Sequence, residues 1–470
     1  MKNYSRRKFI KKSGISAIAS IGASAILNNS CEDDISRSQS QGKYMGDFSA
    51  PKIKNIKAAF IGVGSRGIGH VNNFNTHKDT EIVSVCDLYK KRVENLTKKL
   101  NLNLSTDGYW GDENAWIKMV EDKRPDIVFI STNWDNHAPM AIRCMELGSH
   151  VFVEVPLANT IEDLWKIVNT SEKTQKHCMM LENVNYAREE LMFLNICRQG
   201  KIGEFLHAEA AYIHDLRWQM MEKNKNMQIP DDFPGTGSWR TKQYSKNIGN
   251  LYPTHGLGPV AQYMSLARGD DNFNKIVSLS SPSRGRELFA KNHFPKDDEW
   301  NKINYQNGDI NTSIIKTTYG KTIMIQWDET SPRPYTRHNL IQGTKGTLAG
   351  FPTRVYFDNK EVALSGGHSA WIEGDDLDSI YKKYDHPLYK RLNDKTSNSG
   401  HGGMDGIMMY RIIECLKKGS PLDQNVYEGA FWSAVTPLSR ISVINDGAPQ
   451  SFPDFTRGNW KSTKPLDIIQ

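Results

Sequence analysis

The chain has 470 residues, of which 38% are hydrophobic and 10% aromatic, and its formal net charge at pH 7 is +7. A chain of this length and composition is expected to fold into two or three domains with a sizeable apolar core, which excludes a fibrous or disordered protein. Six of the basic residues lie in residues 1–30, which contain no acidic residue, so the remainder carries a charge of only +1. A nearly neutral chain without a basic run lacks the electrostatic footprint of a nucleic-acid-binding protein.

The first thirty residues have the pattern of an export signal. Arg6 and Arg7 precede a mildly apolar run over residues 15–27. A basic region before a short apolar stretch predicts an export signal, and the paired arginines indicate the twin-arginine route. The run is too short and too weakly apolar to span a bilayer stably. We therefore expect residues 1–31 to direct export to the periplasm or the cell envelope.

Cys31 follows this run and precedes three acidic residues, an arrangement that resembles a lipoprotein cleavage site. Asn28 and Asn29 stand where small or apolar residues are usual, so membrane anchoring through a lipid on Cys31 stays an open alternative. Residues 32–52 are polar and are expected to form a linker. The other five cysteines form no CxxC pair and lie mostly in apolar runs, which predicts neither a disulfide framework nor a metal site.

From about residue 53, short apolar runs alternate with longer segments of helical spacing. Strands that alternate with helices predict a parallel sheet with right-handed crossovers, so we assign residues 53–185 to a Rossmann-type domain. The expected strands are residues 58–61, 82–86, 127–131, 151–155 and 178–182, and the clearest expected helices are residues 136–147 and 161–175.

After about Tyr186 this rhythm ends. A helix near residues 187–198 and a strand at residues 205–213 are followed by a long polar loop to Asn250. We expect residues 186–470 to form an α+β domain with a mixed, mostly antiparallel sheet, which makes the chain an α/β protein. The further expected strands are residues 276–280, 312–318 and 322–328 with short ones between 338 and 364, and the further expected helices are residues 404–417 and 426–444.

Residues 62–67, Gly-Val-Gly-Ser-Arg-Gly, fit the pattern G-x-G-x-x-G and stand directly between an expected strand and an expected helix. In such a turn Gly62 permits the tight bend, Gly64 leaves room for a pyrophosphate, and Gly67 allows close packing of helix on strand. The phosphates lie against free N–H groups at the helix N-terminus. The pattern alone is weak, but its position predicts a dinucleotide site.

Asp87 ends the second expected strand, 20 residues after Gly67. A carboxylate at this place accepts hydrogen bonds from ribose hydroxyls and repels a 2′-phosphate, so the sequence favours NAD over NADP. Arg66 is able to balance a phosphate, but its place inside the turn suits the pyrophosphate better.

Two motifs at strand ends, residues 133–137 (Asn-Trp-Asp-Asn-His) and 154–156 (Glu-Val-Pro), resemble the Gfo/Idh/MocA group of sugar-processing oxidoreductases. Within it the chain is similar to glycosyl hydrolase family 109, the NAD-dependent α-N-acetylgalactosaminidases, from about Lys57 to the C-terminus. The more specific matches are residues 252–259 (Tyr-Pro-Thr-His-Gly-Leu-Gly-Pro), 330–335 (Thr-Ser-Pro-Arg-Pro-Tyr) and 401–405 (His-Gly-Gly-Met-Asp).

The resemblance implies a set of contacts with NAD and with a sugar. Beside the three glycines, the implied NAD contacts are Ser65, Arg66, Asp87, Trp134, Asn136, His137, Glu154, Val155 and Asn183. The implied sugar contacts are Tyr212, Arg240, Tyr252, Pro253, Thr254, His255 and Tyr335. Single members also have structural interpretations, such as packing of Tyr212 in a sheet, a surface ion pair of Arg240, or a core position of Trp134. Their joint occurrence favours a site in which residues 186–470 bind the substrate.

NAD-dependent glycosidases are an exception to the usual pair of catalytic carboxylates. The expected reaction oxidises the sugar transiently at C3, which acidifies the C2 proton. A base removes this proton, the glycosidic oxygen leaves by elimination, water adds, and C3 is reduced again. His255 is the first candidate for proton transfer because histidine has a reference pKa of about 6.5. Tyr252 is expected to donate or accept a proton at the same hydroxyl, and His401, on a glycine-rich turn, is a second candidate.

The expected substrate is a glycoside, with an N-acetylgalactosamine-terminated glycan as the one implied by the resemblance. An NAD-dependent sugar dehydrogenase is the alternative. Dehydrogenases of the wider group commonly carry Glu-Lys-Pro, and the loss of that lysine to Val155 argues against simple sugar dehydrogenation. A non-catalytic sugar-binding lipoprotein is disfavoured by the intact glycine pattern, and a homo-oligomer stays an open alternative.

Overall fold

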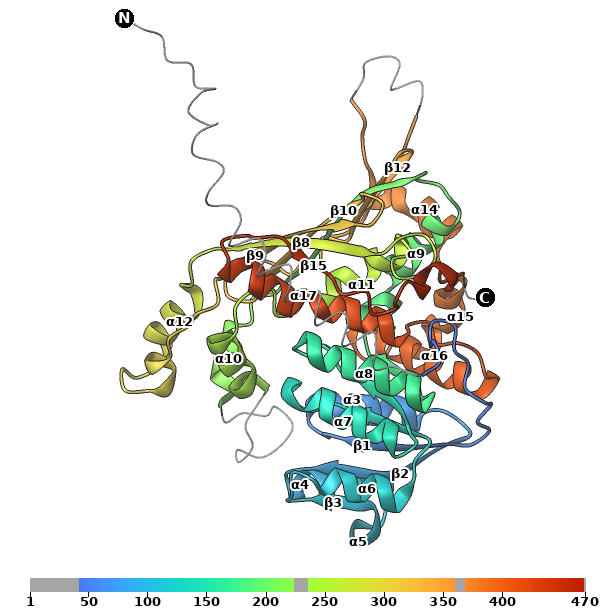
Figure 1. The fold of residues 1–470 in the computed structure, drawn as a ribbon, viewed down its shortest axis with the longest axis vertical. Helices are drawn as coiled ribbons and strands as arrows, with labels where there is room; N and C mark the ends of the chain where they lie inside the picture. The colour runs from blue at the N-terminus through green and yellow to red at the C-terminus, as the bar shows by residue number, and fades with distance from the viewer. Residues whose placement is uncertain (1–41, 224–235, 360–367, 469–470) are drawn as a thin grey trace, which may run out of the picture. The chain divides into compact units, whose positions relative to one another are not determined.

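The computed structural model describes residues 42–223, 236–359 and 368–468 (Figure 1). The expected export signal, with Arg6, Arg7 and Cys31, lies outside the described residues. Within the described part, no helix combines the length and the apolar composition needed to cross a membrane.

The first sheet is a six-stranded parallel sheet in the order β3-β2-β1-β4-β5-β6. Its central strands are buried on both faces. Phe60, Phe129 and Phe152 lie in register on adjacent strands, and their rings stack with centroids 4.9 and 5.2 Å apart. This arrangement confirms the Rossmann-type domain expected from the alternating runs. The strands are β1 (Ile56–Ile61), β2 (Thr80–Asp87), β3 (Gly108–Trp110), β4 (Ile127–Ile130), β5 (His150–Val153) and β6 (Cys178–Met180).

The helices that connect these strands begin near the carboxyl ends of the strands, as crossovers in a parallel sheet require. They are α3 (Ser65–Asn75), α4 (Lys90–Leu100), α5 (Leu104–Asp107), α6 (Ala115–Lys123), α7 (Trp134–Glu146) and α8 (Ile161–Thr174), and the 3₁₀ turn η1 (Asn183–Tyr186) follows β6. The carboxyl edge of the sheet therefore collects the starts of α3, α7 and η1, where most of the expected NAD contacts lie.

The second sheet has nine strands in the order β14-β13-β12-β11-β7-β10-β9-β8-β15. Only the pair β7 and β10 is parallel, and every other neighbouring pair is antiparallel. The mixed, mostly antiparallel sheet is confirmed. Its strands are β7 (Phe205–Ile213), β8 (Phe273–Ser280), β9 (Ile310–Thr317), β10 (Thr322–Asp328), β11 (Leu340–Gly343), β12 (Gly346–Ala349), β13 (Arg354–Phe357), β14 (Ile372–Glu373) and β15 (Gln450–Ser451).

Several helices of the second domain were missed by the sequence interpretation. The polar segment before Asn250 contains α10 (Thr236–Lys246), whose sequence has no continuous apolar stripe. The helices of this domain are α9 (Arg188–Arg198), α10, α11 (Thr254–Tyr263), α12 (Gly285–His293), α14 (Leu377–Tyr384), α15 (Pro387–Thr396), α16 (Met404–Lys418) and α17 (Val426–Ile444), and its 3₁₀ turns are η2 (Arg217–Lys223), η3 (Glu299–Lys302), η4 (Gly374–Asp376), η5 (His401–Gly403) and η6 (Asn459–Ser462).

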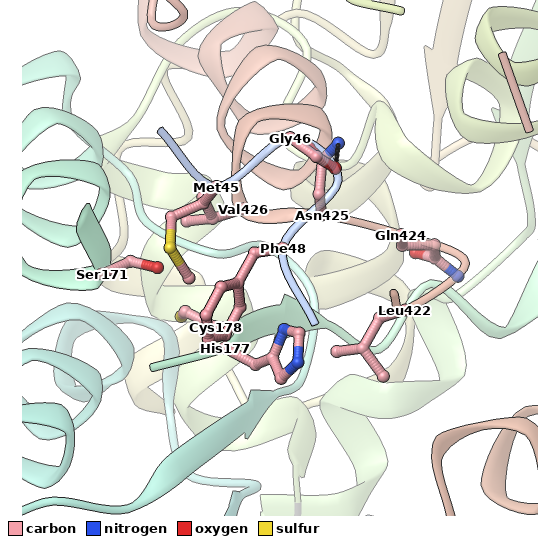
Figure 2. A pocket seen from close by; sticks show the side chains of 10 residues that line it. All are labelled: Met45, Gly46, Phe48, Ser171, His177, Cys178, Leu422, Gln424, Asn425 and Val426. Atoms are coloured by element: carbon pink, nitrogen blue, oxygen red, sulfur yellow. Dashed lines mark hydrogen bonds between the residues drawn. The ribbon is translucent and has the colours of Figure 1, made fainter. Parts of the chain in front are cut away.

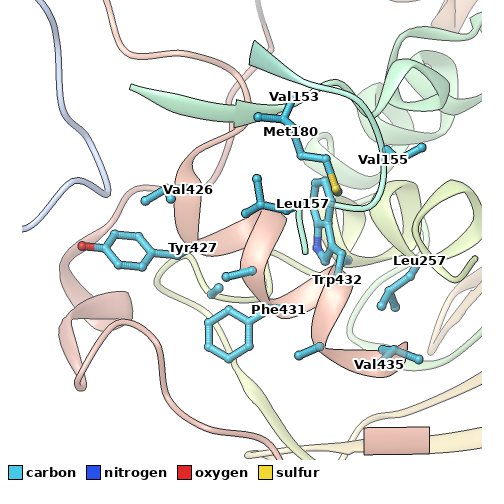
Figure 3. Close-up of a cluster of buried hydrophobic side chains, with 14 of the residues drawn as sticks. Val153, Val155, Leu157, Met180, Leu257, Val426, Tyr427, Phe431, Trp432 and Val435 are labelled. Atoms are coloured by element: carbon cyan, nitrogen blue, oxygen red, sulfur yellow. The ribbon is translucent and has the colours of Figure 1, made fainter. Parts of the chain in front are cut away.

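Helix α17 joins the two sheets into one hydrophobic core. It packs against β8 of the second sheet and against β6 and α8 of the first domain. Figure 3 shows Trp432 and Phe431 of α17 in the same cluster as Val153, Leu157 and Met180. Val155, of the Glu-Val-Pro motif, is buried in this cluster.

The described part of the expected linker, residues 42–52, is packed against the protein rather than extended as a free chain. Met45 is buried, its amide donates to the hydroxyl of Tyr427 at 3.1 Å, and the rings of Tyr44 and Tyr427 stack at 4.8 Å. Residues 32–52 are polar overall, and this average composition did not indicate that a few apolar and aromatic residues hold the segment in place. Figure 2 shows a small pocket between this segment and the rest of the protein. It is lined by Phe48 of the segment and by His177, which precedes β6, and none of its lining residues is an expected site residue.

Candidate active site

The glycine-rich turn has the geometry that a dinucleotide requires. Gly62 has a φ of +81°, and a Cβ atom there would lie 2.5 Å from the carbonyl oxygen of Ser131. A Cβ at Gly67 would lie 1.9 Å from the carbonyl oxygen of Gly62, so only glycine allows helix α3 to approach the strand. A Cβ at Gly64 would meet only the end of the Arg92 side chain, at 3.5 Å. Each glycine thus has the part expected for it.

The N-terminus of α3 is available to an anion. Gly64 is the N-cap, no side chain caps the helix, and no acidic residue lies in its first turn. Ser65, the first helical residue, is exposed. The free amides at this end and the open space beside Gly64 fit the pyrophosphate of NAD.

Asp87 is fixed at the end of β2, beside the turn. Its Oδ2 accepts from the amide of Val63 at 2.9 Å, and its Oδ1 accepts from the amide of Tyr89 at 3.0 Å. Nη1 of Arg92 lies 3.5 Å from Oδ2. The carboxylate therefore stands where the ribose hydroxyls of a dinucleotide are expected.

The start of α7 places Trp134 toward the second domain and His137 toward the protein interior. Trp134 is nearly buried, and its ring lies 5.9 Å from that of Tyr252. His137 is fully buried, with its ring nitrogens 2.7 Å from the carbonyl oxygen of Pro156 and 3.2 Å from that of Thr132. Burial lowers the pKa of His137. In this geometry His137 supports the loop after β5, whereas Asn136, in the first turn of α7, remains partly exposed.

Glu154, directly after β5, is held by an arginine and a histidine. Its Oε1 accepts from Nε of Arg66 at 2.8 Å and lies 2.5 Å from Nε2 of His70. Burial acts to raise the pKa of Glu154, but the charge of Arg66 and the hydrogen bond from His70 outweigh it and lower the pKa to about 2. The carboxylate is therefore ionised at neutral pH and serves as a hydrogen-bond acceptor.

The second domain reaches this cluster through Asp405, in the first turn of α16. Its carboxylate accepts two hydrogen bonds from Arg66, at 2.7 and 3.1 Å, and one from Nδ2 of Asn183 at 2.7 Å. His401 is exposed, and its Nδ1 lies 2.8 Å from Oδ2 of Asp405. Among the described residues the side-chain partners of His401 are Asp405 and Arg66, so the structure places this candidate catalytic residue beside the cofactor contacts.

An aromatic wall of Trp134, Tyr212, Tyr252 and His255 forms the other half of the site. The rings of Tyr212 and Tyr252 lie 4.8 Å apart, and His255 meets them edge-on at 5.3 and 4.9 Å. Burial raises the pKa of Tyr252 well above its ordinary value, although the charge of Arg240 opposes this shift. Tyr252 is therefore protonated at neutral pH, which favours donation over acceptance of a proton.

Pro253 and Thr254 place His255 on this wall. Pro253 is the N-cap of α11 and its carbonyl oxygen accepts from the amide of Leu257 at 3.0 Å, while Thr254 is buried at the first helical position. Neither side chain forms part of the aromatic wall itself. The two residues thus contribute chiefly by starting the helix that carries His255.

Arg240 lies against the aromatic wall, and the buried carboxylate of Glu329 holds its guanidinium in place. Its guanidinium is 4.4 Å from the ring centroid of Tyr252 and 5.4 Å from that of Trp134. Nη2 donates to Oε1 of Glu329 at 2.9 Å, and Tyr244 hydrogen-bonds both partners. Glu329 is fully buried, so the surface ion pair considered for Arg240 is in fact an interior one. The arrangement presents a fixed cation to the site.

Tyr335 completes the wall at its exposed edge. Its ring lies 6.3 Å from that of Tyr212 and 5.1 Å from that of His214, and its hydroxyl accepts from Nη1 of Arg337 at 2.7 Å. The structure thus brings Tyr212, Tyr252, His255, Arg240 and Tyr335 together from four separate segments.

Glu182 is the main functional residue that the sequence interpretation missed. Its Oε1 lies 2.7 Å from Nδ1 of His255, and the residue is fully buried. Among the residues that the structure describes, its other oxygen has no hydrogen-bond partner. The available signal was its place two residues after β6, because residues that follow the strands of a parallel sheet collect at the ligand-binding edge. Glu329 directly follows β10 in the same way.

Comparison with known families covers most of the chain. Residues 56–182 match the family model for the oxidoreductase family with an NAD-binding Rossmann fold, and residues 186–462 match the C-terminal domain of glycosyl hydrolase 109. Glycosyl hydrolase family 109 protein 1 of Akkermansia muciniphila is 54% identical over 91% of this chain and 87% of its own. The α-N-acetylgalactosaminidase of Shewanella oneidensis is 48% identical over the full length of both chains.

Solved structures of similar fold are more distant in sequence. An NAD-binding oxidoreductase from Klebsiella pneumoniae is 16% identical with a TM-score of 0.64, and covers 85% of this chain and 99% of its own. An inositol dehydrogenase homologue from Azotobacter vinelandii, solved with NAD⁺, is 14% identical with a TM-score of 0.62, over 86% and 99% of the two chains. These likenesses show the fold, and the family matches identify the chain as an NAD-binding member of glycosyl hydrolase family 109.

Proposed function

We propose that this glycosidase hydrolyses α-linked N-acetylgalactosaminides, with His255 as the proton-transfer group. The full-length similarity to the Shewanella oneidensis α-N-acetylgalactosaminidase supports the choice of sugar. The observation that carries the mechanism is the pair of Glu182 and His255 on the wall where Trp134 of the NAD-binding domain meets Tyr252 of the second domain. A proton-transfer group is thereby placed between the two halves of the site.

Each residue of the wall has a part in this proposal. Glu182 holds Nδ1 of His255, which leaves Nε2 to take a proton from the sugar, and the protonated phenol of Tyr252 donates to a sugar hydroxyl. The aromatic faces cover the apolar side of the sugar ring, and Arg240 presents donors to its polar side. Bound NAD supplies a reversible hydride acceptor at the sugar. Ser65, Gly64, Asp87, Glu154 and Asn183 are the residues that would hold it.

Chromogenic α- and β-glycosides, assayed on purified protein without added NAD, test the proposal. The α-N-acetylgalactosaminide is expected to be cleaved, and in heavy water the released sugar is expected to contain deuterium at C2 because a base removes the C2 proton. A substrate that lacks the C3 hydroxyl is expected to bind without reacting. Cleavage of that 3-deoxy glycoside at a normal rate, with no deuterium at C2, would contradict the mechanism.

We also propose that the protein acts outside the cytoplasm, after export by the twin-arginine route. The support is the sequence of residues 1–31, with Arg6 and Arg7 before an apolar run. A tightly held NAD suits this location because the route carries folded proteins. Retention at the membrane through a lipid on Cys31 is tested by Cys31→Ala, which is expected to release the protein from the membrane fraction if the cysteine is acylated.

A further inference from the structure

One carboxylate of the second domain holds two of the residues expected to contact NAD in the first. Asp405 binds Arg66 through two hydrogen bonds and Asn183 through a third. Its side chain is only 5% exposed, so these interactions are largely shielded from solvent. Bidentate pairs of arginine and carboxylate are among the stronger hydrogen-bonded interactions in proteins, and shielding reduces their screening by salt.

The guanidinium of Arg66 is shared between two carboxylates. Nε donates to Glu154, which follows β5, while Nη1 and Nη2 donate to Asp405 on α16. Arg66 is the second residue of α3, at the end where the pyrophosphate is expected. The side chain therefore forms a bridge across the entrance of the turn, from one domain to the other, with its charge balanced by protein groups.

The backbone before α16 is shaped to bring Asp405 to this bridge. Gly400, Gly402 and Gly403 have φ values of +93°, +68° and +98°, a region that L-residues rarely adopt. A Cβ at Gly400 would lie 2.8 Å from Oδ2 of Asp405. The same turn carries His401, whose Nδ1 lies against that oxygen. Three glycines within four consecutive positions thus serve the placement of one carboxylate.

We propose that Asp405 is a cofactor-retaining residue, which keeps Arg66 and Asn183 closed over bound NAD. Release of the nucleotide then requires the Asp405–Arg66 pair to open. His401, whose Nδ1 lies 2.8 Å from Oδ2 of Asp405, belongs to the same cluster. The inference rests on the NAD site and extends the proposed function, since a hydrolase that regenerates NAD in each turnover gains from never releasing it.

The test is the rate at which bound NAD exchanges with isotopically labelled NAD, followed by mass spectrometry of the protein-bound nucleotide. Asp405→Asn is expected to speed exchange by about tenfold or more, as the loss of a buried charge-assisted pair predicts. Its activity is expected to become dependent on added NAD, whereas wild-type activity is not.

Asp423→Asn is the matched control. The Asp423 side chain is also 5% exposed and also binds an arginine of α16, with Arg411 donating at 3.0 and 2.8 Å. Asp423 lies beyond the C-terminal end of α16, whereas the glycine-rich turn precedes the helix, so this control removes an equivalent buried charge away from that turn. It is expected to lower stability while leaving the exchange rate within about twofold of wild type, because it touches none of the expected NAD contacts.

His401→Ala provides a second variant if Asp405→Asn does not fold, since the His401 side chain is 58% exposed. It removes one of the partners of Asp405 and is expected to speed exchange by a few-fold. Folded variants at both positions with wild-type exchange rates would overturn the proposal. Faster exchange in Asp405→Asn than in the wild type, together with no glycosidase activity in the wild type, would uphold the retaining role of Asp405 and reject the proposed hydrolase reaction.

Discussion

Nδ1 of His255 lies 2.7 Å from Oε1 of Glu182, so a fully buried carboxylate determines which nitrogen of this histidine faces the site. The two residues lie 73 positions apart, on α11 and directly before η1. The pair therefore depends on the packing of the second domain against the carboxyl edge of the parallel sheet.

Substitution of Glu182 is expected to reduce turnover more than substrate binding. His255→Ala should lower kcat by about two to four orders of magnitude, the usual contribution of a general acid or base. Glu182→Gln should lower kcat by roughly tenfold to a hundredfold with little change in KM, because a neutral amide replaces the charged acceptor that orients the imidazole. Steady-state kinetics at saturating substrate separate the two parameters.

The conservative variant Glu182→Asp and the bound nucleotide serve as controls for this prediction. Aspartate keeps the charge and is expected to restore part of the lost turnover, while NAD content stays at the wild-type level in all three variants. If kcat falls equally in Glu182→Gln and Glu182→Asp, and both variants also lose bound NAD, then Glu182 has a purely structural role.

Selectivity for NAD over NADP is expected to depend on Asp87. Nucleotide released from the denatured protein should be NAD, as mass spectrometry can show. Asp87→Ser removes the charge that repels a 2′-phosphate, and Arg92, whose Nη1 lies 3.5 Å from the carboxylate, then places a positive charge near that phosphate. Affinity for NADP should rise by about tenfold or more relative to NAD. An unchanged ratio of the two dissociation constants would place the selectivity elsewhere.

Acid is expected to destabilise the fold in part through His386. Burial lowers the pKa of this histidine to about 4, whereas the unfolded chain has a value near 6.5. The unfolded state therefore binds more protons below pH 6.5, so stability falls as the pH drops from 6.5 toward 4. By pH 5 this one group is expected to remove about 2 kcal/mol from the free energy of unfolding.

His386→Asn isolates that effect. Nδ1 of His386 accepts from the amide of Leu388 and caps α15, and asparagine is a preferred N-cap residue that does not titrate. Urea unfolding at pH 7.5 and at pH 5 should show a smaller loss of stability in the variant than in the wild type. The prediction fails if the two proteins lose stability equally.

Export is expected to depend on both arginines of the N-terminal pattern. Arg6→Lys together with Arg7→Lys keeps the charge but removes the pair that the twin-arginine route recognises, so precursor should accumulate in the cytoplasm. Cell fractionation and immunoblotting measure the distribution. Normal export of the double variant would point to a different route.

The parallel sheet and its nucleotide turn were predictable because their signals are local. A buried strand, three glycines and a strand-end aspartate occur within residues 56–87. In the structure each of them has the position and the contacts that the local sequence predicts. The contacts of Asp405 and Glu182 were not predictable in this way. Asn183 and Asp405 are 222 positions apart, and no local pattern encodes a pairing that only the packing of two domains creates.

The helices of the second domain show a related limit. Helix α10 (residues 236–246) is predominantly polar, so its sequence lacks the period-3.6 apolar stripe from which helices are recognised. Two of its residues, Arg240 and Tyr244, are instead fixed by hydrogen bonds to Glu329 of another segment. Helix α10 is therefore held by polar contacts inside the site, and not by an apolar face that its sequence pattern would have revealed.

Because α17 packs against both β8 and β6, one cluster of buried hydrophobic residues extends from the first sheet to the second, and we expect the two sheets to unfold together. Ligand binding to one half of such a protein raises the stability of the whole by the same free energy. Trp116 on α6 and Trp327 on β10 should accordingly report a single unfolding transition with one midpoint. Removal of NAD from the first domain should lower this shared midpoint. The unfolding temperature of the sugar-binding domain therefore measures how much NAD the protein still carries.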